Sequence, residues 1–459
     1  MESEHDRATV IHEAALGLLS DPGVRLEHQT VLRLALRAGA YPGRDAGVVR
    51  IPPELVDECL GMCPGTVRLS DRAGAGHALS ADCEPSFWSC PGLYMRHDGS
   101  RRPFTSGDMA DMTRLLDRLE HVSVVFGMSL DDIPPAARDV VGLSIIARTT
   151  RKHARVLCFS PEGAHAIVEA RHVVSPDPWL SLGFTAHGPL RWTRLALDIF
   201  ARTAGHGIPV TVNGEPMAGA SSPVTIAGAA AVGGAEILAG IVVNQLLEPG
   251  RPCIYNLGLA HTMDMRTAIA VTGGPENALF AQISSMMGRY YGLPSASWVS
   301  TEAMTPDAQA GLEKAFGYQT HVDAGVSAIW GVGQLESELT VSPAQAVIDN
   351  EIIGHVLRYR RGYDLTEDAM ASEVTRSVGI GGSFLDRDHT FEQFRTELHE
   401  PHALWRDRHA AWTANGSPPL ARRAEDIADG LMREPAEPCL DDHQVAELDK
   451  ISAAVLRGI

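Results

Sequence analysis

The feature that most constrains this sequence is a regular alternation of helix-length apolar segments with short runs rich in β-branched residues, which continues from Ser106 to Ile380. This alternation is typical of parallel α/β folds. We predict eight strands, at 122–127, 155–159, 180–184, 208–212, 252–255, 295–299, 326–330 and 378–380. Eight β/α units are the number that closes a barrel, so we expect a TIM-type (β/α)8 barrel. An open doubly wound sheet is the alternative, but it needs a phosphate-binding glycine loop after its first strand, and the sequence has none there.

Segments of a different pattern flank the alternating region. Residues 1–105 contain helical stretches, several short strands and a hairpin tip at 97–100, which together predict an N-terminal α+β extension. Residues 106–390 form the predicted catalytic barrel domain. Residues 391–459 are rich in Trp, Arg, Glu and Pro, and we expect them to form a C-terminal helical segment packed on the barrel.

The composition excludes several classes of protein. The formal net charge of −18 argues against a nucleic-acid-binding surface, and it suits either a cationic substrate or an ordinary acidic enzyme surface. No apolar run approaches the roughly 20 uninterrupted residues of a membrane span, and the N-terminal stretch lacks the basic segment of a signal peptide. We therefore expect a cytoplasmic protein that does not contact membranes. The seven cysteines include no C-x-x-C pair, which favours reduced thiols over a metal site.

One strand–loop–helix unit, residues 208–247, carries the clearest functional signal. A β-branched run ends at Asn213-Gly214-Glu215-Pro216, which suits neither a strand nor a helix interior. Ser221, Ser222 and Pro223 then predict the start of an apolar helix at Val224. Because a carboxylate on a constrained loop after a buried strand has no obvious packing role, we interpret Glu215 as functional.

Other side chains with suitable chemistry follow the remaining strands, at the end of a barrel where active sites lie. The candidates are acids, amides, aromatic residues and histidines: Asn213, Tyr255, Asn256, His261, Trp298, Glu302, Trp330 and His389. Without a cluster of Arg or Lys, this set fits a cationic ligand better than a phosphorylated one. Trp298 and Trp330 suit core packing as well as a ligand cage, and His389 suits a helix cap as well as a lid. Asp264 and Arg266 are interpreted as a structural ion pair.

Several reaction classes lose support because their motifs are missing. The sequence has no G-x-S-x-G, H-E-x-x-H or Walker motif, so hydrolysis by a serine nucleophile, zinc proteolysis and nucleotide hydrolysis are disfavoured. We predict no metal in the site. A Schiff-base aldolase would need a lysine near a strand end, and only Lys152 lies near a strand. A barrel enzyme of another class and a binding protein without turnover remain as alternatives.

Several stretches, in this order, resemble the trimethylamine methyltransferase family of corrinoid-dependent enzymes. They are TTRKH at 149–153, PMAGASSPV at 216–224, AEILAG at 235–240 with Pro249-Gly250, DMR at 264–266, GPE at 274–276, PDAQAG at 306–311, and GGSFL at 381–385 with His389-Thr390. The resemblance implies a TIM barrel that moves a methyl group from a methylamine to the cobalt of a corrinoid (cobalamin) carried by a separate partner protein. It implies no tightly bound cofactor of the chain itself.

The stretch that resembles the pyrrolysine position of the family is Ser297-Trp298-Val299-Ser300, which contains only standard residues. The resemblance is therefore to the non-pyrrolysine branch, which implies glycine betaine or a similar quaternary amine as substrate. On this hypothesis Glu215 and His389 are catalytic. The roles predicted for the substrate-binding residues are cation–π contact from Tyr255, Trp298 and Trp330, countercharge from Glu215 or Glu302, and carboxylate binding by Asn213, Asn256, His261 or His389. Assembly into a homo-oligomer is left open.

Overall fold

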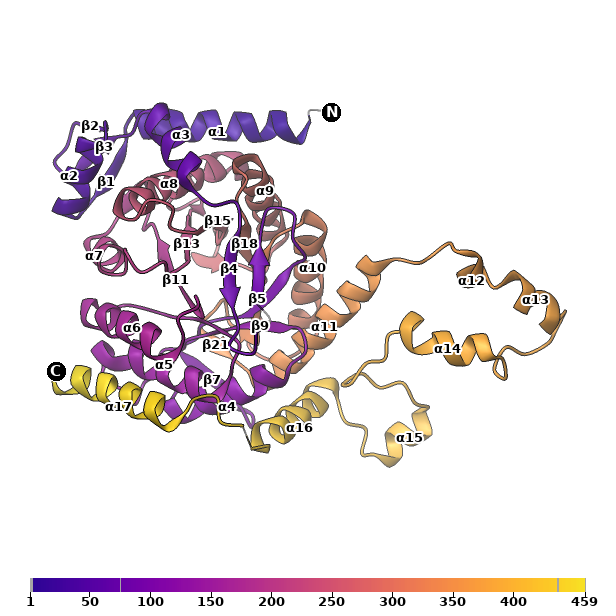
Figure 1. The fold of residues 1–459 in the computed structure, drawn as a ribbon. Helices are drawn as coiled ribbons and strands as arrows, with labels where there is room; N and C mark the ends of the chain where they lie inside the picture. The colour runs from indigo at the N-terminus through magenta and orange to yellow at the C-terminus, as the bar shows by residue number, and fades with distance from the viewer. Residues whose placement is uncertain (1–2, 75, 436, 459) are drawn as a thin grey trace.

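The core of the molecule is a closed barrel of eight parallel strands (Figure 1). The computed structural model describes residues 3–74, 76–435 and 437–458. In order around the barrel, the strands are β10 (His153–Arg155), β11 (Leu180–Thr185), β13 (Val210–Asn213), β15 (Cys253–Gly258), β18 (Ser295–Trp298), β19 (Ala328–Val332), β6 (Ser86–Ser89) and β9 (Val122–Phe126). The predicted α/β barrel is confirmed.

Seven of the barrel strands overlap the predicted ones, but the predicted closing strand at 378–380 is wrong. Val378 ends helix α13 (Ser372–Val378), and Ile380 is fully exposed. The barrel is closed instead by β6, whose short sequence SFWS lies in the range assigned to the N-terminal extension. This corrects the boundary predicted at residues 105 and 106, because the barrel begins before it. Buried Phe87 and Trp88 give β6 its core contacts.

Helices alternate with the strands and cover the outside of the barrel. They are α4 (Ser106–Arg118), α5 (Arg138–Thr149), α6 (Pro161–Val174), α7 (Arg194–Arg202), α8 (Ile226–Leu247), α9 (Pro275–Tyr291), α10 (Ala308–Ala324) and α11 (Pro343–Arg361), with a 3-10 turn at Pro135–Ala137. Local sequence sets their first turns: Ser160 caps α6 and Ser342 caps α11, each followed by a proline in the first helical position. Helix α8 begins at Ile226 rather than Val224, because the Ser221 hydroxyl accepts a hydrogen bond from the Met217 amide (2.8 Å) in the preceding turn.

Helix α8 is the one helix of the described chain that is long and apolar enough to cross a membrane. Of its most apolar window, 83% is buried inside the molecule. It packs against α1 (Glu4–Ser20), α2 (Gln29–Arg37) and α3 (Pro53–Met62) on one side and against β13 and β15 on the other. Its apolar surface is therefore used in the core.

The N-terminal segment forms a layer over the outside of α8. Its strands β1 (Val24–Leu26), β2 (Tyr41–Pro42) and β3 (Val48–Arg50) join β12 (Arg191–Trp192) in a four-stranded sheet. The helical stretches and short strands predicted for this segment are confirmed by three helices and three strands between Glu4 and Met62.

The two ends of the barrel are different. The hairpin of β4 (Val67–Ser70) and β5 (Gly76–Leu79) fills the end at which the strands begin, where Val67, Leu69 and Leu79 join the inner core around Trp88. The other end, the mouth, is bordered by two small sheets. One consists of β14 (Met217–Ala218), β16 (His261–Asp264) and β17 (Ile269–Val271), and the other of β20 (Gln334–Leu335), β21 (Thr340–Val341), β7 (Tyr94–His97) and β8 (Ser100–Pro103). The mouth is therefore the open end.

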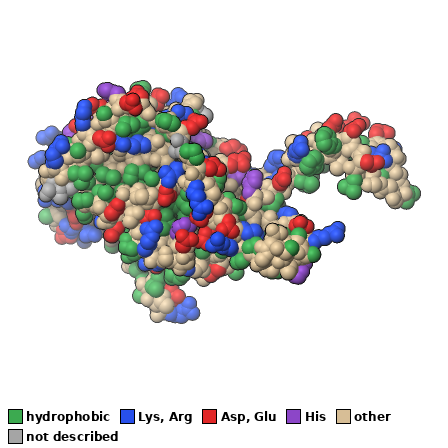
Figure 2. All heavy atoms as spheres, turned by 90° about the horizontal axis from the view of Figure 1, so that it is seen from below, with side chains coloured by type: hydrophobic (Ala, Val, Ile, Leu, Met, Phe, Trp, Pro, Cys, Tyr) green, Lys and Arg blue, Asp and Glu red, His purple; other side chains and the backbone are tan. Residues whose placement is uncertain are grey.

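The C-terminal segment leaves the barrel and returns to it. After α11, the helices α12 (Glu367–Met370), α13, α14 (Asp388–Glu397) and α15 (His409–Ala414) contain no buried residue and project away from the body (Figures 1 and 2). We call residues 362–400 the arm. Helix α16 (Leu420–Arg433) then packs on α11 and α4, and α17 (Asp442–Arg457) packs on α5 and α6.

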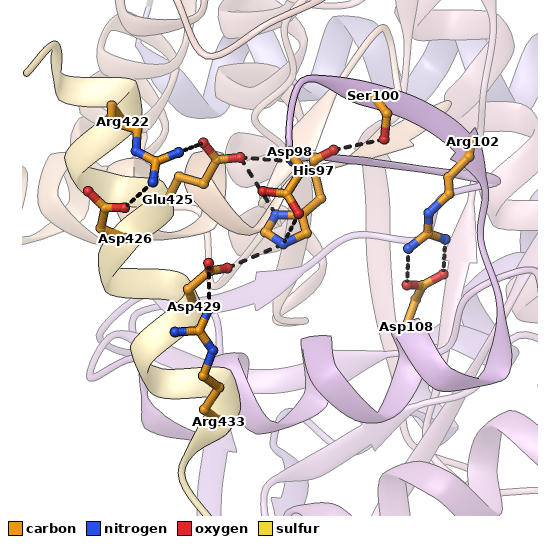
Figure 3. A network of polar contacts seen from close by, with 10 residues as sticks. All are labelled: His97, Asp98, Ser100, Arg102, Asp108, Arg422, Glu425, Asp426, Asp429 and Arg433. Atoms are coloured by element: carbon orange, nitrogen blue, oxygen red, sulfur yellow. Dashed lines mark hydrogen bonds and ion pairs between the residues drawn. The ribbon is translucent and has the colours of Figure 1, made fainter.

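A polar network holds α16 against the β7–β8 hairpin (Figure 3). The imidazole of His97 lies 3.2 Å from an Asp429 oxygen and 3.8 Å from a Glu425 oxygen. The Asp98 amide, at the hairpin tip, donates a hydrogen bond to Glu425 (2.9 Å). The predicted tip at 97–100 therefore also serves as the attachment point for the returning chain.

Candidate active site

Two adjoining cavities occupy the barrel mouth, with volumes of about 420 and 540 Å³. They share four lining residues, His187, Glu215, Ser337 and Glu338. The smaller cavity is further lined by Met217, Ser221, His261, Thr272 and Trp298, and the larger one by Arg155, Thr185, Asn213 and Trp330. Both volumes suit a small-molecule ligand.

Glu215 lies on the boundary between the cavities, as the sequence predicted for a functional residue. The loop that carries it is pressed onto α8, since a Cβ on Gly214 would lie 2.7 Å from the Gly233 carbonyl oxygen. The Glu215 carboxylate makes no hydrogen bond or ion pair with the described residues. Burial alone raises its pKa to about 7, because no neighbouring cation favours the charged form.

Two further carboxyl groups lie near Glu215. Burial and the Glu215 charge raise the pKa of Glu338 to about 8, and Glu338 too has no hydrogen-bond partner among the described residues. Burial and the same charge raise the pKa of Glu236, on α8, to about 7. Glu236 accepts a hydrogen bond from the Leu190 amide (2.8 Å) behind the cavity wall. The mouth therefore holds acidic groups without cationic partners, an arrangement that favours a cationic ligand.

Backbone strain supports the position of Glu338. Three consecutive residues, Glu336, Ser337 and Glu338, have left-handed φ values of 54°, 49° and 78°. Such values are unfavourable for residues other than glycine and are concentrated at functional sites. The Glu336 carboxylate is paired with Arg101 at 2.7 Å, which fixes the loop and leaves Glu338 to face the cavity.

A buried arginine, Arg155, also lines the larger cavity. Arg155 is the last residue of β10 and is 4% exposed. Its Nη2 donates to the Thr211 hydroxyl (2.7 Å), its Nε has no acceptor, and it forms no ion pair with a described residue. Burial lowers its pKa to about 9, so the guanidinium is charged at neutral pH. An uncompensated buried cation is costly, which favours an anionic group of a ligand beside it.

Gly183 provides the space for this guanidinium. It lies on the neighbouring strand β11, and a Cβ at this position would lie 1.5 Å from Arg155 Nη2. No other residue type fits there unless the arginine moves.

The aromatic residues of the mouth have separate roles. The Trp330 ring stacks on Trp88 with ring centroids 5.8 Å apart, and the Arg155 guanidinium lies 5.7 Å from its centroid. Trp330 therefore supports the protein's own cation, whereas Trp298 lines the smaller cavity with Glu215, Glu338 and His261. Of the two, Trp298 is the one placed for cation–π contact with a ligand.

The predicted amides form a chain of hydrogen bonds. Asn256 donates to Asn213 (2.9 Å), and Asn213 donates to the Thr185 hydroxyl (3.0 Å). Only Asn213 and Thr185 line the cavity, so Asn256 acts by orienting Asn213.

His261 lines the smaller cavity as a neutral acceptor. Its Nδ1 lies 3.0 Å from the Leu259 carbonyl oxygen, an acceptor, so Nδ1 carries the proton. Nε2 has no hydrogen bond to a described residue. Burial lowers the pKa of His261, which favours the neutral ring.

Besides Asn256, three predicted residues are not brought to the cavities. Tyr255 faces outward from β15 and packs on Tyr291, with ring centroids 5.5 Å apart. Glu302 accepts hydrogen bonds from the Thr272 and Gly273 amides (2.6 and 2.9 Å) and so braces the rim. His389 lies on α14 in the arm, where Nε2 is 3.2 Å from the Asp368 carbonyl oxygen. Within one chain, none of the three faces the mouth.

The structure also decides smaller predictions. Asp264 and Arg266 do form an ion pair (3.0 Å), and the arginine side chain is 89% exposed. Lys152 Nζ donates to the Leu116 and Leu119 carbonyl oxygens at the closed end of the barrel, far from a position suited to a Schiff base.

Sequence reasoning missed Arg155, Glu236 and Glu338. Arg155 was assigned to the start of a strand at 155–159, whereas β10 ends there. Glu236 did carry a signal, since it is the only charged residue in the apolar helix α8. Glu338 carried none, because its position depends on the irregular backbone of its loop.

The fold and the site define a (β/α)8-barrel protein with a pocket at the mouth that holds a guanidinium and carboxyl groups without ion-pair partners among the described residues. The chain belongs to the trimethylamine methyltransferase (MTTB) family, whose model matches residues 2–454. The family resemblance read from the sequence is confirmed.

Relatives cover nearly the whole chain. It is 30% identical to a trimethylamine methyltransferase of Methanosarcina barkeri, over 97% of this chain and 91% of the relative. It is 28% identical to a glycine betaine methyltransferase of Desulfitobacterium hafniense, over 98% of this chain and 95% of that relative. The crystal structure of the Methanosarcina barkeri monomethylamine methyltransferase shares the fold, with a TM-score of 0.54 and 11% identity over 93% of this chain and 86% of that one.

Proposed function

We propose that this protein transfers a methyl group from a zwitterionic quaternary amine, glycine betaine or a close analogue, to the Co(I) of a corrinoid carried by a separate protein. The observation that carries the proposal is a set of three ionisable side chains in one cavity, a base and two acids, that have no ion-pair partners among the described residues. Arg155 lines the same cavity as Glu215 and Glu338, and none of the three has an ion-pair partner among the described residues.

A betaine would span the two adjoining cavities of the mouth. Its trimethylammonium group would lie between Glu215 and Glu338 against the face of Trp298, where the carboxylates supply countercharge and the indole a cation–π contact of about 0.5–2 kcal/mol. Its carboxylate would accept hydrogen bonds from the guanidinium of Arg155 and from the side-chain amide of Asn213, which both line the larger cavity. Each half of the substrate would relieve an uncompensated charge of the protein.

The chemistry needs orientation more than acid catalysis. A corrinoid carried by the partner protein would supply Co(I) as the nucleophile, and the residues of the mouth would present the methyl carbon to it in line with the carbon–nitrogen bond. As that bond breaks, its electron pair remains on nitrogen, and the leaving group is a neutral tertiary amine that needs no proton. The residues of the mouth therefore act by holding one methyl group outward and by excluding water from the cation.

The test is methylation of cob(I)alamin with glycine betaine, carnitine, choline and trimethylamine, combined with calorimetric binding of each. Arg155→Gln should reduce kcat/KM for betaine at least 100-fold. It should change kcat/KM for choline less than threefold, because choline has no carboxylate. Gly183→Ala should give the same pattern by displacing the guanidinium. Glu215→Gln should weaken the binding of all the quaternary amines in the panel.

Arg266→Gln is the matched control, since it removes an exposed arginine from a neighbouring loop. Equal losses for betaine and choline in Arg155→Gln would remove Arg155 from carboxylate recognition. Tight betaine binding by the wild-type chain without methyl transfer would establish a binding protein and overturn the enzymatic proposal.

A further inference from the structure

A second cluster of ligating side chains lies outside the barrel, where the arm joins the body. It consists of Glu351 and His355 on α11 and His399 on the chain that returns from α14. One ligating atom from each of these residues lies within 4.8 Å of the other two. Glu351 and His355 are four residues apart, which places both on one face of the helix.

The carboxylate of Glu351 is buried and held in a fixed position, with one oxygen available to a ligand ion. It is 6% exposed, and its Oε1 accepts hydrogen bonds from the His402 and Ala403 amides (2.8 and 3.0 Å). These bonds fix the carboxylate and leave Oε2 buried without a partner among the described residues. A buried carboxylate oxygen without a donor is costly unless a cation or proton satisfies it.

The two histidines are oriented in a way that suits metal binding. His355 Nδ1 lies 2.8 Å from the Glu351 carbonyl oxygen, so Nδ1 carries the proton and Nε2 presents its lone pair. His399 Nε2 is buried without a partner, and the two rings are 4.3 Å apart between centroids.

Gly354 keeps the space between the elements open. A Cβ at this position would lie 3.0 Å from His399 Cε1 and 3.1 Å from His121 Nε2. His121 is therefore next to the cluster and could approach an ion bound there, although it is not one of its three members.

From this arrangement we propose that Glu351, His355 and His399 bind a divalent transition-metal ion of the zinc class, which fastens the returning end of the arm to α11. Two imidazole nitrogens and one carboxylate oxygen are a donor set that Zn²⁺ prefers. In a tetrahedral site with zinc–nitrogen distances of ~2.0–2.1 Å, the ligand atoms are about 3.3 Å apart, so rotations of the half-buried imidazoles close the site. The site is separate from the mouth and needs no catalytic step.

The experiment uses the full chain, purified without a histidine tag and stripped with EDTA. Titration with ZnCl₂ by calorimetry, and metal analysis after gel filtration, should give one Zn²⁺ per chain with a Kd below about 1 μM. His355→Ala and His399→Ala should each weaken binding at least 100-fold, and Zn²⁺ should protect the Leu398–His402 backbone from hydrogen exchange in the wild-type chain only.

His97→Ala is the matched control, because His97 lies among carboxylates at the other His–acid cluster of the described chain (Figure 3). Circular dichroism of the metal-free variants separates loss of the site from loss of the fold. Substoichiometric zinc in the wild-type chain, or unchanged affinity in both His355→Ala and His399→Ala, would overturn the proposal. Zinc binding that disappears only in His97→Ala would place the ion at the other cluster and would overturn it as well.

Discussion

At the scale of single residues, the carboxylates of the mouth connect ligand affinity to pH. The pKa of Glu215 is raised to about 7 and that of Glu338 to about 8, so both groups lose their protons as the pH rises through the neutral range. Choline is a suitable probe, because its own charge does not change there. We expect its affinity to increase roughly tenfold from pH 6 to pH 8, as measured by calorimetry. In Glu215→Gln the increase should be smaller, and a pH-independent affinity of the wild-type chain would show that the carboxylates do not face the cation.

The same raised pKa values affect stability in the opposite direction. The folded chain retains these two protons above the ordinary carboxyl pKa of 4.5, whereas the unfolded chain releases them. The folded state therefore binds more protons between pH 4.5 and about 8, and the contribution of these groups to stability decreases as the pH rises. A ligand cation would offset this loss, since it favours the charged forms.

Sequence reasoning located at the mouth those residues whose position follows from their place at or after the end of a strand. Glu215, Asn213 and Trp298 were found in this way, because a barrel collects the residues that follow its strands at one end. Arg155 was missed because the predicted strand ended at residue 159, four residues beyond the end of β10, so that Arg155 was not recognised as a mouth residue. Tyr255 was predicted to face the substrate, but it faces outward, because the alternation of side chains along β15 turns every second one toward the helices.

At the scale of elements, a buried ion pair ties two helices to two strand ends beside the mouth. Lys314 of α10 and Asp349 of α11 are both fully buried and lie 3.3 Å apart. Lys314 Nζ also donates to the Val299 and Gly331 carbonyl oxygens (3.1 and 2.6 Å), after β18 and within β19. Asp349 accepts from the Gly333 amide at 2.8 Å. The pair therefore fixes α10 and α11 on the strands that carry Trp298 and Trp330.

Removing one partner should be more damaging than removing both. Lys314→Met leaves a buried carboxylate without its cation, and we expect a loss of about 3–5 kcal/mol in the free energy of unfolding, measured by urea denaturation. Lys314→Met combined with Asp349→Leu should recover much of that loss. Lys450→Met is the control, because the Lys450–Glu447 pair is exposed and its removal should leave the urea midpoint unchanged. Equal stability of Lys314→Met and the wild-type chain would show that the pair does not hold these elements.

The elements themselves were predictable where their pattern was regular. The helix–strand alternation located seven strands, since each has its own apolar run between polar loops. The eighth strand, β6, has four residues and follows a series of hairpins, so its local sequence does not distinguish it from them. Only closure of the barrel identifies it, and closure is a property of the whole chain.

At the scale of the whole molecule, the arm differs from the body because its helices contain no buried residue and each has at most ten residues. Helices this short are marginal without packing, so we expect trypsin to cut the free chain first after Arg376, Arg387 or Arg395 while the barrel resists. Mass spectrometry of the early fragments checks this, and Arg148 of α5 is the internal reference. The arm also exposes large apolar side chains, with Ile380 fully exposed and Leu385 90% exposed, and such surface is typical of interaction sites. Arm sites cut as slowly as Arg148 would therefore show that another copy of the chain, or another protein, covers the arm.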